Sequence, residues 1–198
     1  MDGYLQFLLL PAAYLLGSVS SAVVVARIMH LEDPRDVGSK NPGATNILRY
    51  GGKTAAALTL LGDLLKGVVA VVIARLVTDE PLLLASVGLL ALLGHVYPVF
   101  FDFRGGKGVA TGFGVWLALS PWVALALALT WLLAAALFRY SSLSALIATA
   151  LCPLYVWLVL RQWPYVVLSV AMGALLIWRH RSNIEKLLAG KESRIGQA

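Results

Sequence analysis

Long apolar runs alternate with short polar segments along the whole chain. A helix needs about 20 mostly apolar residues to cross a bilayer, so each run that approaches this length predicts a membrane-spanning helix. The qualifying runs are residues 4–28, 54–77, 81–101, 143–160 and 163–178. A further uncharged run, residues 108–138, is too long for one comfortable span. It predicts either one tilted helix or two short helices that are separated at Ser120-Pro121.

The basic residues distinguish these two alternatives, because cytoplasmic loops carry an excess of Lys and Arg. With two helices in 108–138 there are seven spans, and one side of the membrane receives most basic residues. The other side receives only Arg75 and Arg161, while Lys66 lies within a span. With one helix, the basic tail from Arg179 would lie opposite the first basic loop. We therefore predict an all-α, polytopic integral membrane protein with seven transmembrane helices, the N-terminus outside and the C-terminus in the cytoplasm.

Composition supports a membrane protein and excludes several other classes. Of the 198 residues, 60% are hydrophobic and 13% are charged, whereas a soluble domain carries about 25% charged residues. The length suits one membrane-embedded domain, residues 1–198, and the N-terminal run lacks the basic region of a cleaved signal peptide. Topology explains the net charge of +6, so we expect no nucleic-acid partner. The single cysteine, Cys152, excludes an internal disulfide and argues against a cysteine metal site.

Three polar segments share the predicted cytoplasmic face: residues 30–53, residues 101–108 and the tail from Arg179. The first contains hydrogen-bonding side chains on both sides of Gly43. They are Ser39, Asn41, Thr45, Asn46 and Arg49. An arginine can bind phosphate through two hydrogen bonds, and amides and hydroxyls can orient an alcohol or an oxyanion. The alternative is a surface loop that is rich in turn-forming residues.

Two Gly-Gly-Lys sequences, at residues 51–53 and 105–107, each precede a predicted span. Unpaired N–H groups at a helix N-terminus attract anions, and a lysine adds a mobile positive charge. Neither sequence is a P-loop; for the first, that motif needs glycine where Ile47 stands. A simple turn is the favoured interpretation of 51–54. In the second segment Arg104, Lys107 and three glycines make a phosphate site as plausible as a boundary turn.

Charged and polar groups also occur in the tail and within the spans. His180 and Asn183 would share a face of a continuing helix, and histidine is a common general base. The alternative is an amphipathic exit helix on anionic lipid.

Asp63 and Lys66 lie three residues apart inside the second span, where charges are costly and often functional, although a neutralising ion pair is equally plausible. We expect His95 to line the same pocket or to make a structural hydrogen bond.

Together these segments resemble the bacterial acyl-phosphate:glycerol-3-phosphate acyltransferase (PlsY) family. The resemblance covers nearly the whole chain, in matching order and spacing. It is carried by residues 14–18 (Tyr-Leu-Leu-Gly-Ser), 38–49, 63–67 (Asp-Leu-Leu-Lys-Gly), 94–111, 139–143 (Arg-Tyr-Ser-Ser-Leu) and 180–192. It implies a multi-pass enzyme of the bacterial cytoplasmic (inner) membrane with its active site facing the cytoplasm. We expect no metal and no cofactor. Members transfer a fatty acyl group from acyl phosphate to the 1-hydroxyl of glycerol 3-phosphate, giving lysophosphatidate and phosphate.

The resemblance also implies roles for single residues. Its catalytic residues correspond to Ser39, Arg49, Lys107, His180 and Asn183. Its glycerol-3-phosphate loop corresponds to Gly105, Gly106 and Gly108, and its structural glutamate to Glu192. From their chemistry we add further substrate-binding or phosphate-binding residues: Asn41, Gly43, Thr45, Asn46, Lys66 and Arg104. Asp63 and His95 are added as supporting residues. The chain departs from the family pattern at Arg104, Glu185 and Lys191, none of which is a predicted catalytic residue.

We expect direct acyl transfer, with the acyl chain between spans and open to the bilayer. Either His180 or a phosphate of the substrate takes the proton of the alcohol. The main alternative function is a transporter or channel for an organic phosphate, which calls for polar groups along both halves of a path. A membrane scaffold would not explain the amides and hydroxyls of 39–46. A thioester donor is a further alternative, but the His-x4-Asp pattern is absent because Glu185 stands five residues after His180, where the pattern needs aspartate.

Overall fold

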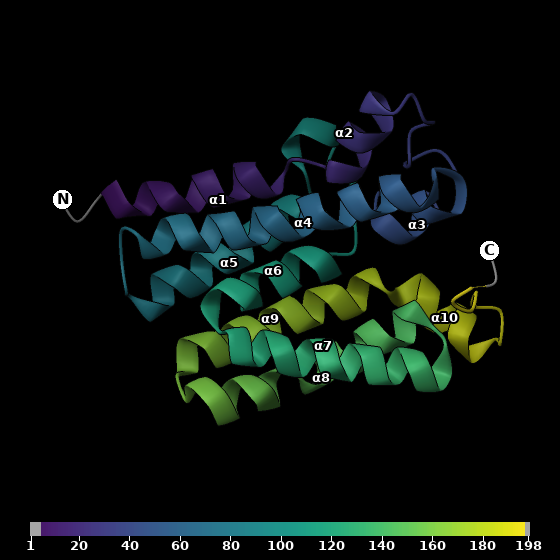
Figure 1. Ribbon diagram of the computed structural model, residues 1–198. Coiled ribbons are helices and arrows are strands. Elements are labelled where there is room, and N and C mark those ends of the chain that lie inside the picture. Colours follow the sequence, from purple (N-terminus) through teal and green to yellow (C-terminus); the bar gives the residue numbers. More distant parts are fainter. Residues whose placement is uncertain (1–4, 197–198) are drawn as a thin grey trace. The chain divides into compact units, whose positions relative to one another are not determined.

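The structure is a computed structural model that describes residues 5–196, and this part of the chain is all-helical, without strands (Figure 1). The predicted all-α class is therefore confirmed. The first predicted span starts at Tyr4, which lies outside the described residues. The chain divides into two compact units, Met1–Leu119 and Ser120–Ala198. One membrane-embedded domain over residues 1–198 stays a prediction.

The first unit is organised around its longest helix, α4. Its elements are η1 Leu5–Leu8, α1 Leu9–Gly17, α2 Ser21–Ile28, α3 Ala44–Tyr50, α4 Gly52–Arg75, α5 Pro81–Val96, η2 Val99–Phe101 and α6 Val109–Leu119. Helix α4 contacts all the other α-helices of this unit. In Figure 1, α1, α4 and α5 run alongside one another, and α2 and α3 lie at the end of the unit remote from the N-terminus.

Helices of the first unit approach one another closely at glycines. A Cβ added to any of four glycines would collide with a backbone carbonyl oxygen of the facing helix. The colliding pairs are Gly17 with Ala91, Gly94 with Tyr14, Gly67 with Thr111, and Gly114 with Leu64. Small residues at such crossings are typical of helix packing in membranes, where backbones approach without a hydrophobic driving force. The α1–α5 and α4–α6 crossings therefore depend on glycine.

The second unit consists of α7 Pro121–Phe138, α8 Ser141–Leu160, α9 Trp163–Arg179 and α10 Arg181–Leu188. Helix α8 packs against both α7 and α9, and α10 contacts α8 and α9. The predicted break in 108–138 is observed, because α6 ends at Leu119 and α7 begins at Pro121. The Ser120 Oγ accepts a hydrogen bond from the Val123 N–H at 3.4 Å and caps the new helix. Proline is well suited to the first helical position, where its missing N–H costs nothing.

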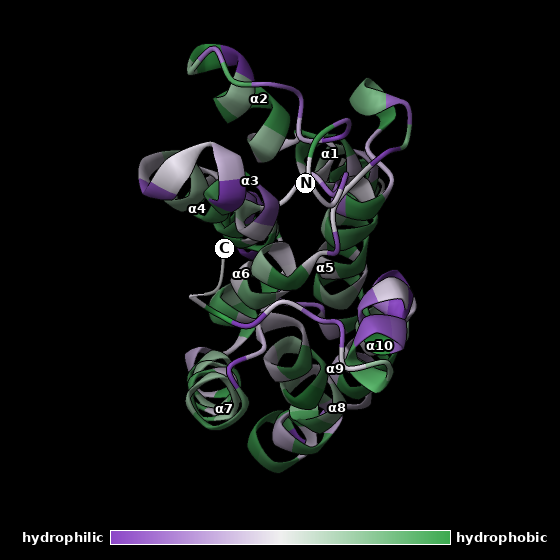
Figure 2. Ribbon diagram, turned by 90° about the vertical axis from the view of Figure 1, so that its right-hand side faces the viewer, coloured by the Kyte–Doolittle hydropathy of each residue, from purple (hydrophilic) through white to green (hydrophobic). Residues whose placement is uncertain are grey.

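Within residues 5–196, four helices are long and apolar enough to cross a membrane: α4, α7, α8 and the segment Pro81–Phe101 that contains α5. The pair Gln6–Gly17 and Ser21–Ile28, bent by 44°, forms a possible fifth span, and α6 and α9 are shorter apolar helices. In Figure 2, hydrophobic colour dominates α5, α7 and α8, whereas α3 and α10 carry hydrophilic colour. Seven spans with the N-terminus outside stay a prediction.

The bend in the first apolar run was not predicted. Residues 4–28 were expected to form one span, but the helix is interrupted at residues 18–20. Ser18 Oγ donates to the Tyr14 carbonyl at 2.8 Å, and Ser20 adopts an extended backbone. The Val19 carbonyl accepts a hydrogen bond from Lys66 Nζ at 2.7 Å. A side chain therefore satisfies a carbonyl near the break, as a protein interior within a membrane requires.

Candidate active site

The loop before α3 is held by the side chain of Asn46, which is 1% exposed. Its Oδ1 accepts a hydrogen bond from the Ser39 N–H at 2.9 Å. Its Nδ2 donates to the carbonyls of Pro34 and Val37, each at 3.0 Å. All three hydrogen bonds go to backbone groups, so the structure gives Asn46 the role of fixing residues 34–39. Phosphate binding by Asn46 stays a prediction.

The Ser39, Thr45 and Arg49 side chains, by contrast, are exposed. Thr45 and Arg49 lie four residues apart on α3 and therefore share one face of that helix. Within the described part of the chain the Arg49 guanidinium forms no hydrogen bond or ion pair. Its donors are available for a phosphate. Asn41 and Gly43 precede the helix and are partly buried, and the Gly43 N–H donates to the Asn41 carbonyl at 2.9 Å.

Arginines join the first two polar segments to each other. Arg35 Nε and Nη2 bind the Asp33 carboxylate at 3.0 and 2.8 Å, and Nη1 reaches the Asp102 carboxylate at 3.4 Å. Arg104 Nη2 donates to the Arg35 carbonyl at 2.8 Å. The Arg35 guanidinium lowers the pKa of Asp33, chiefly through the side-chain hydrogen bond. Arg35 was not singled out from the sequence, although its position two residues after Asp33 permitted the Asp33–Arg35 ion pair.

The glycines of the second polar segment lie against the end of α5. The Gly106 N–H donates to the His95 carbonyl at 3.3 Å. A Cβ on Gly105 would collide with the same carbonyl, and one on Gly106 would collide with His95 Nε2. Gly108 has a φ of +90°, which favours glycine, and α6 begins at the next residue. The loop that was predicted to bind phosphate therefore rests directly on His95.

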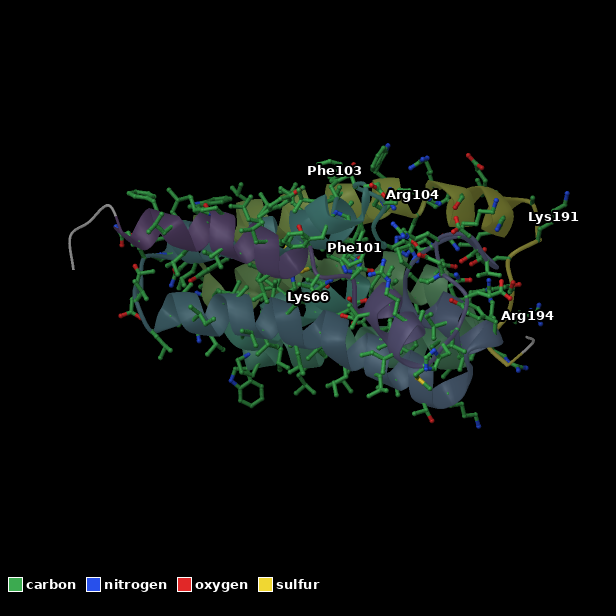
Figure 3. The ribbon with its side chains drawn as sticks, turned by 90° about the horizontal axis from the view of Figure 1, so that it is seen from above. Lys66, Phe101, Phe103, Arg104, Lys191 and Arg194 are labelled. Atoms are coloured by element: carbon green, nitrogen blue, oxygen red, sulfur yellow. The ribbon has the colours of Figure 1, made fainter. Side chains whose placement is uncertain are left out.

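Beneath this loop lies a buried polar cluster. Lys66 Nζ stands 3.0 Å from Asp63 Oδ1, and His95 Nδ1 stands 3.5 Å from the same oxygen. The three side chains are 5–6% exposed. Figure 3 shows Lys66 deep among the helices, with Arg104 and Phe103 in the loop further out. The predicted ion pair of Asp63 and Lys66 within the span is present, and the His95 ring lies beside it. Substrate binding by Lys66 stays a prediction, since its ammonium already bonds Asp63 and Val19.

A groove lies beside Lys66, between α4 and the bent pair α1 and α2. It has a volume of about 360 Å³. Most of its lining is aliphatic: Leu16, Val19, Val24, Val25, Leu58, Leu65 and Val69, with Ser21, Gly62 and Lys66 completing it. Such a groove suits an acyl chain better than a polar ligand. The sequence did not predict it, because the groove depends on the bend at residues 18–20.

In the second unit, Asn183 is held by a carboxylate of the tail. Its Nδ2 donates to Glu192 Oε1 at 2.7 Å, and Ser142 Oγ donates to the same oxygen at 2.7 Å. The tail is fastened again where the Ile195 N–H donates to the Arg139 carbonyl at 2.7 Å. Lys191 and Arg194 lie along this tail in Figure 3. The structural role expected for Glu192 therefore has a geometric basis: it orients Asn183 and joins the tail to the start of α8.

His180 lies at the junction of two helices. The helix does not continue unbroken through this position, because α9 ends at Arg179 and α10 begins at Arg181. Asn183 still approaches His180, because its N–H donates to the His180 carbonyl at 2.8 Å. His180 Nδ1 donates to the Leu176 carbonyl at 2.7 Å, since a carbonyl only accepts. In a neutral imidazole this leaves Nε2 as the basic nitrogen, which suits a general base.

The structure thus groups the predicted residues within each unit. The first unit contains the loop of Ser39, the face of α3 that carries Arg49, the Arg104–Gly108 segment and the Asp63 cluster. The second holds His180 and Asn183 through Leu176, Glu192 and Ser142. Among the described residues, no cluster of three or more His, Cys, Asp or Glu side chains could hold a metal ion. The groups present suit anion binding and proton transfer.

Comparison with known proteins identifies the family. The family model described as glycerol-3-phosphate acyltransferase matches residues 7–190. The glycerol-3-phosphate acyltransferase of Methylococcus capsulatus is 57% identical over 191 residues, 96% of each chain. That of Thioalkalivibrio sulfidiphilus is 55% identical over 184 residues, 93% of this chain and 91% of the relative.

Two crystal structures are also similar over the full length. The glycerol 3-phosphate form of PlsY, an integral membrane glycerol 3-phosphate acyltransferase, has a TM-score of 0.92, 42% identity and 96% coverage of both chains. Its lysophosphatidic acid form has a TM-score of 0.90, 41% identity, and coverage of 97% of this chain and 96% of that chain. This all-helical chain is accordingly an integral membrane protein, and it belongs to the glycerol-3-phosphate acyltransferase family.

Proposed function

We propose that this chain transfers a fatty acyl group from acyl phosphate to the 1-hydroxyl of glycerol 3-phosphate, which gives lysophosphatidate and inorganic phosphate. One observation carries the proposal: the full-length match, at 41–42% identity, to PlsY in its glycerol 3-phosphate and lysophosphatidic acid forms. These two forms contain an acceptor and an acylated product of that protein. Family membership supports acyltransferase activity for this chain.

Acyl phosphate is the donor that the resemblance implies, and the chemistry of the residues supports both this donor and the bilayer as its source. Both substrates carry phosphate, and the first unit offers basic groups on two segments, Arg49 on α3 and Arg104 with Lys107 in the glycine loop. The aliphatic groove beside Lys66 supplies an apolar surface for the acyl chain. We assign the groove to the acyl chain and the glycine loop, Gly105 to Gly108, to glycerol 3-phosphate.

The reaction forms one ester bond and breaks one anhydride bond. The 1-hydroxyl oxygen attacks the acyl carbonyl carbon, and the bond from that carbon to the phosphate oxygen breaks, so phosphate leaves with the electron pair. Since phosphate is a good leaving group, the protein needs to orient the alcohol, stabilise the oxyanion and accept one proton. Ser39 and Arg49 are assigned to substrate phosphate or oxyanion. His180 Nε2 is the proton acceptor within the chain, with Asn183 beside it, and a substrate phosphate is the competing acceptor.

A transporter or channel for an organic phosphate is the alternative that the structure favours less. The charged groups inside the spans, Asp63 and Lys66, form an ion pair with each other, and Lys66 Nζ also donates to the Val19 carbonyl. A transport path instead needs polar groups that face a water-filled route. The family match also supports an enzyme.

Substrate assays with the purified protein in lipid test the function. Glycerol 3-phosphate is incubated in turn with acyl phosphate, acyl-CoA and acyl carrier protein thioester. We expect lysophosphatidate from acyl phosphate only. Product from either thioester would overturn the assigned donor. No product from any donor would overturn the function and favour transport.

We further propose seven spans in the bacterial inner membrane, with the active site facing the cytoplasm. The support is the charge asymmetry, which puts Arg75 and Arg161 on the side opposite most basic residues. The single Cys152 can be replaced by serine, and one cysteine then introduced at Asp79 or at Lys191. An impermeant thiol reagent applied to intact cells should label the first position only. Labelling at Lys191 would overturn the orientation.

A further inference from the structure

The buried cluster of Asp63, Lys66 and His95 has no assigned part in the chemical step described above. Asp63 and Lys66 belong to α4 and His95 to α5, and all three side chains are at least nine-tenths buried. Ion pairs buried among apolar residues add little stability, because the cost of removing both charges from water offsets their attraction. Stability alone is therefore a weak reason for three ionisable groups in the interior of a membrane bundle.

The cluster connects the break between α1 and α2 to the glycine loop. At one end, Lys66 Nζ donates to the Val19 carbonyl at the break between α1 and α2, 2.7 Å away. At the other end, the His95 ring lies against Gly106, where an added Cβ would stand 2.8 Å from Cε1. Asp63 Oδ1 joins these two ends, because it faces both Lys66 Nζ and His95 Nδ1.

The backbone around the cluster is fixed from a third side. Thr111 Oγ1, on α6, donates to the Asp63 carbonyl at 2.8 Å. Helix α6 begins directly after the glycine loop, so both ends of the loop are tied to the same cluster: the His95 end through Gly106, and the α6 end through Thr111. The His95 ring cannot move toward Gly106, which has no room for even a methyl group on this side, whereas Gly105 lies against the backbone carbonyls of His95 and Val96.

We propose that Asp63, Lys66 and His95 are positioning residues that set the affinity for glycerol 3-phosphate by holding the glycine loop. Asp63 orients the imidazole, the imidazole supports Gly106, and Lys66 fixes Asp63 against the helix break. This inference rests on the proposed function, in which the glycine loop binds glycerol 3-phosphate. The cluster acts on acceptor binding and leaves the chemical step to other residues.

Two variants separate the parts of this arrangement. His95→Asn retains a nitrogen one bond beyond Cγ, where Nδ1 faces Asp63, but removes the part of the ring that supports Gly106. The double variant Asp63→Asn with Lys66→Met retains the ring and removes both charges together, which leaves no unpaired charge in the interior. Thr59→Val is the matched control, because Thr59 is fully buried on the same helix, one turn before Asp63.

Steady-state kinetics in lipid are measured against each substrate, together with equilibrium binding of radiolabelled glycerol 3-phosphate. For His95→Asn we expect the KM and the Kd for glycerol 3-phosphate to rise about tenfold, which corresponds to about 1.4 kcal/mol. The double variant should raise both constants several-fold. In His95→Asn kcat should stay within threefold of the parent and the KM for acyl phosphate should not change. For the double variant the Kd for glycerol 3-phosphate is the deciding constant, because Lys66 also lines the groove assigned to the acyl chain. Thr59→Val should change none of these constants.

Other outcomes overturn the inference. A fall in kcat at constant KM, or an equal rise of both KM values, would show that the cluster only maintains the fold. The same conclusion follows if neither variant can be recovered as folded protein by size-exclusion chromatography. Failure of the proposed function is distinguishable, because the binding measurement needs no turnover. Binding by the parent without product from any donor would overturn the function and would still test the cluster.

Discussion

Replacing Asn46 with alanine tests whether this side chain fixes the loop of Ser39. The substitution removes three hydrogen bonds, one from the Ser39 N–H and one each to the Pro34 and Val37 carbonyls. At about 1 kcal/mol for each bond, the free energy of unfolding should fall by about 3 kcal/mol. For a chain of this length, Tm should fall by roughly 6–12 °C. Asn46→Asp should lose at least as much, because it keeps only the bond from Ser39 and turns a negative charge toward two carbonyls.

Thermal unfolding in detergent, followed by tryptophan fluorescence, measures this loss, and turnover at low temperature measures its effect on activity. Asn41→Ala is the matched control, since the side chain of this nearby amide forms no hydrogen bond with any described residue. We expect Asn41→Ala to leave Tm unchanged. An unchanged Tm in Asn46→Ala together with a raised KM would refute the structural role and favour a direct contact with substrate phosphate.

Four further changes test the charges and the groove. Arg49→Lys keeps the charge but loses the two-pronged geometry, so kcat/KM should fall by tenfold or more, on the order of a lost charge-assisted hydrogen bond; unchanged turnover contradicts the bidentate contact. His180→Gln should lower kcat by roughly 10²–10⁴-fold if this residue is the base, whereas activity within a few-fold of the parent favours the substrate phosphate. Asp33→Asn should cost at most about 1 kcal/mol of stability near neutral pH. Because Arg35 lowers the pKa of Asp33, the difference in Tm between the parent and Asp33→Asn should be complete above the ordinary carboxyl pKa. It should vanish as the pH falls through the lowered pKa of Asp33, and a difference that does not change with pH would contradict the Asp33–Arg35 ion pair. Val24→Trp should fill the groove and slow transfer of long acyl chains more than short ones, at constant KM for glycerol 3-phosphate; equal rates for all chain lengths would contradict the assignment.

Most of the helices could be predicted from sequence, because an apolar run of sufficient length in lipid must form a helix to satisfy its backbone groups. Ser120-Pro121 marked a break that the structure shows, since serine caps a helix and proline suits its first turn. The bend at residues 18–20 could not be predicted. Its sequence, Ser-Val-Ser, is compatible with a helix, and the Val19 carbonyl finds its partner in Lys66, 47 residues away.

The sequence predicted which types of residue occur at the site better than it predicted the role of each residue. Asn46 looked like a substrate ligand beside Arg49, yet its amide binds three backbone groups and is buried. Arg35 had no evident purpose, yet it links two loops through Asp33 and Asp102. A pattern of polar residues shows which groups are available, but the partner of each group depends on contacts between distant segments.

The sequence by itself determined the membrane class, the helical fold, the family and the chemical types of the groups offered to phosphate. The family rests on the resemblance of several motifs along the whole chain, and the other three follow from local composition and spacing, which act on each segment separately. Only the tertiary structure decided that His95 supports Gly106, that Glu192 orients Asn183, and that a groove opens beside Lys66. The physical reason is that hydrogen bonds and close packing depend on which atoms are near one another in space. The residues of one segment do not determine which segment, distant in sequence, will pack against it.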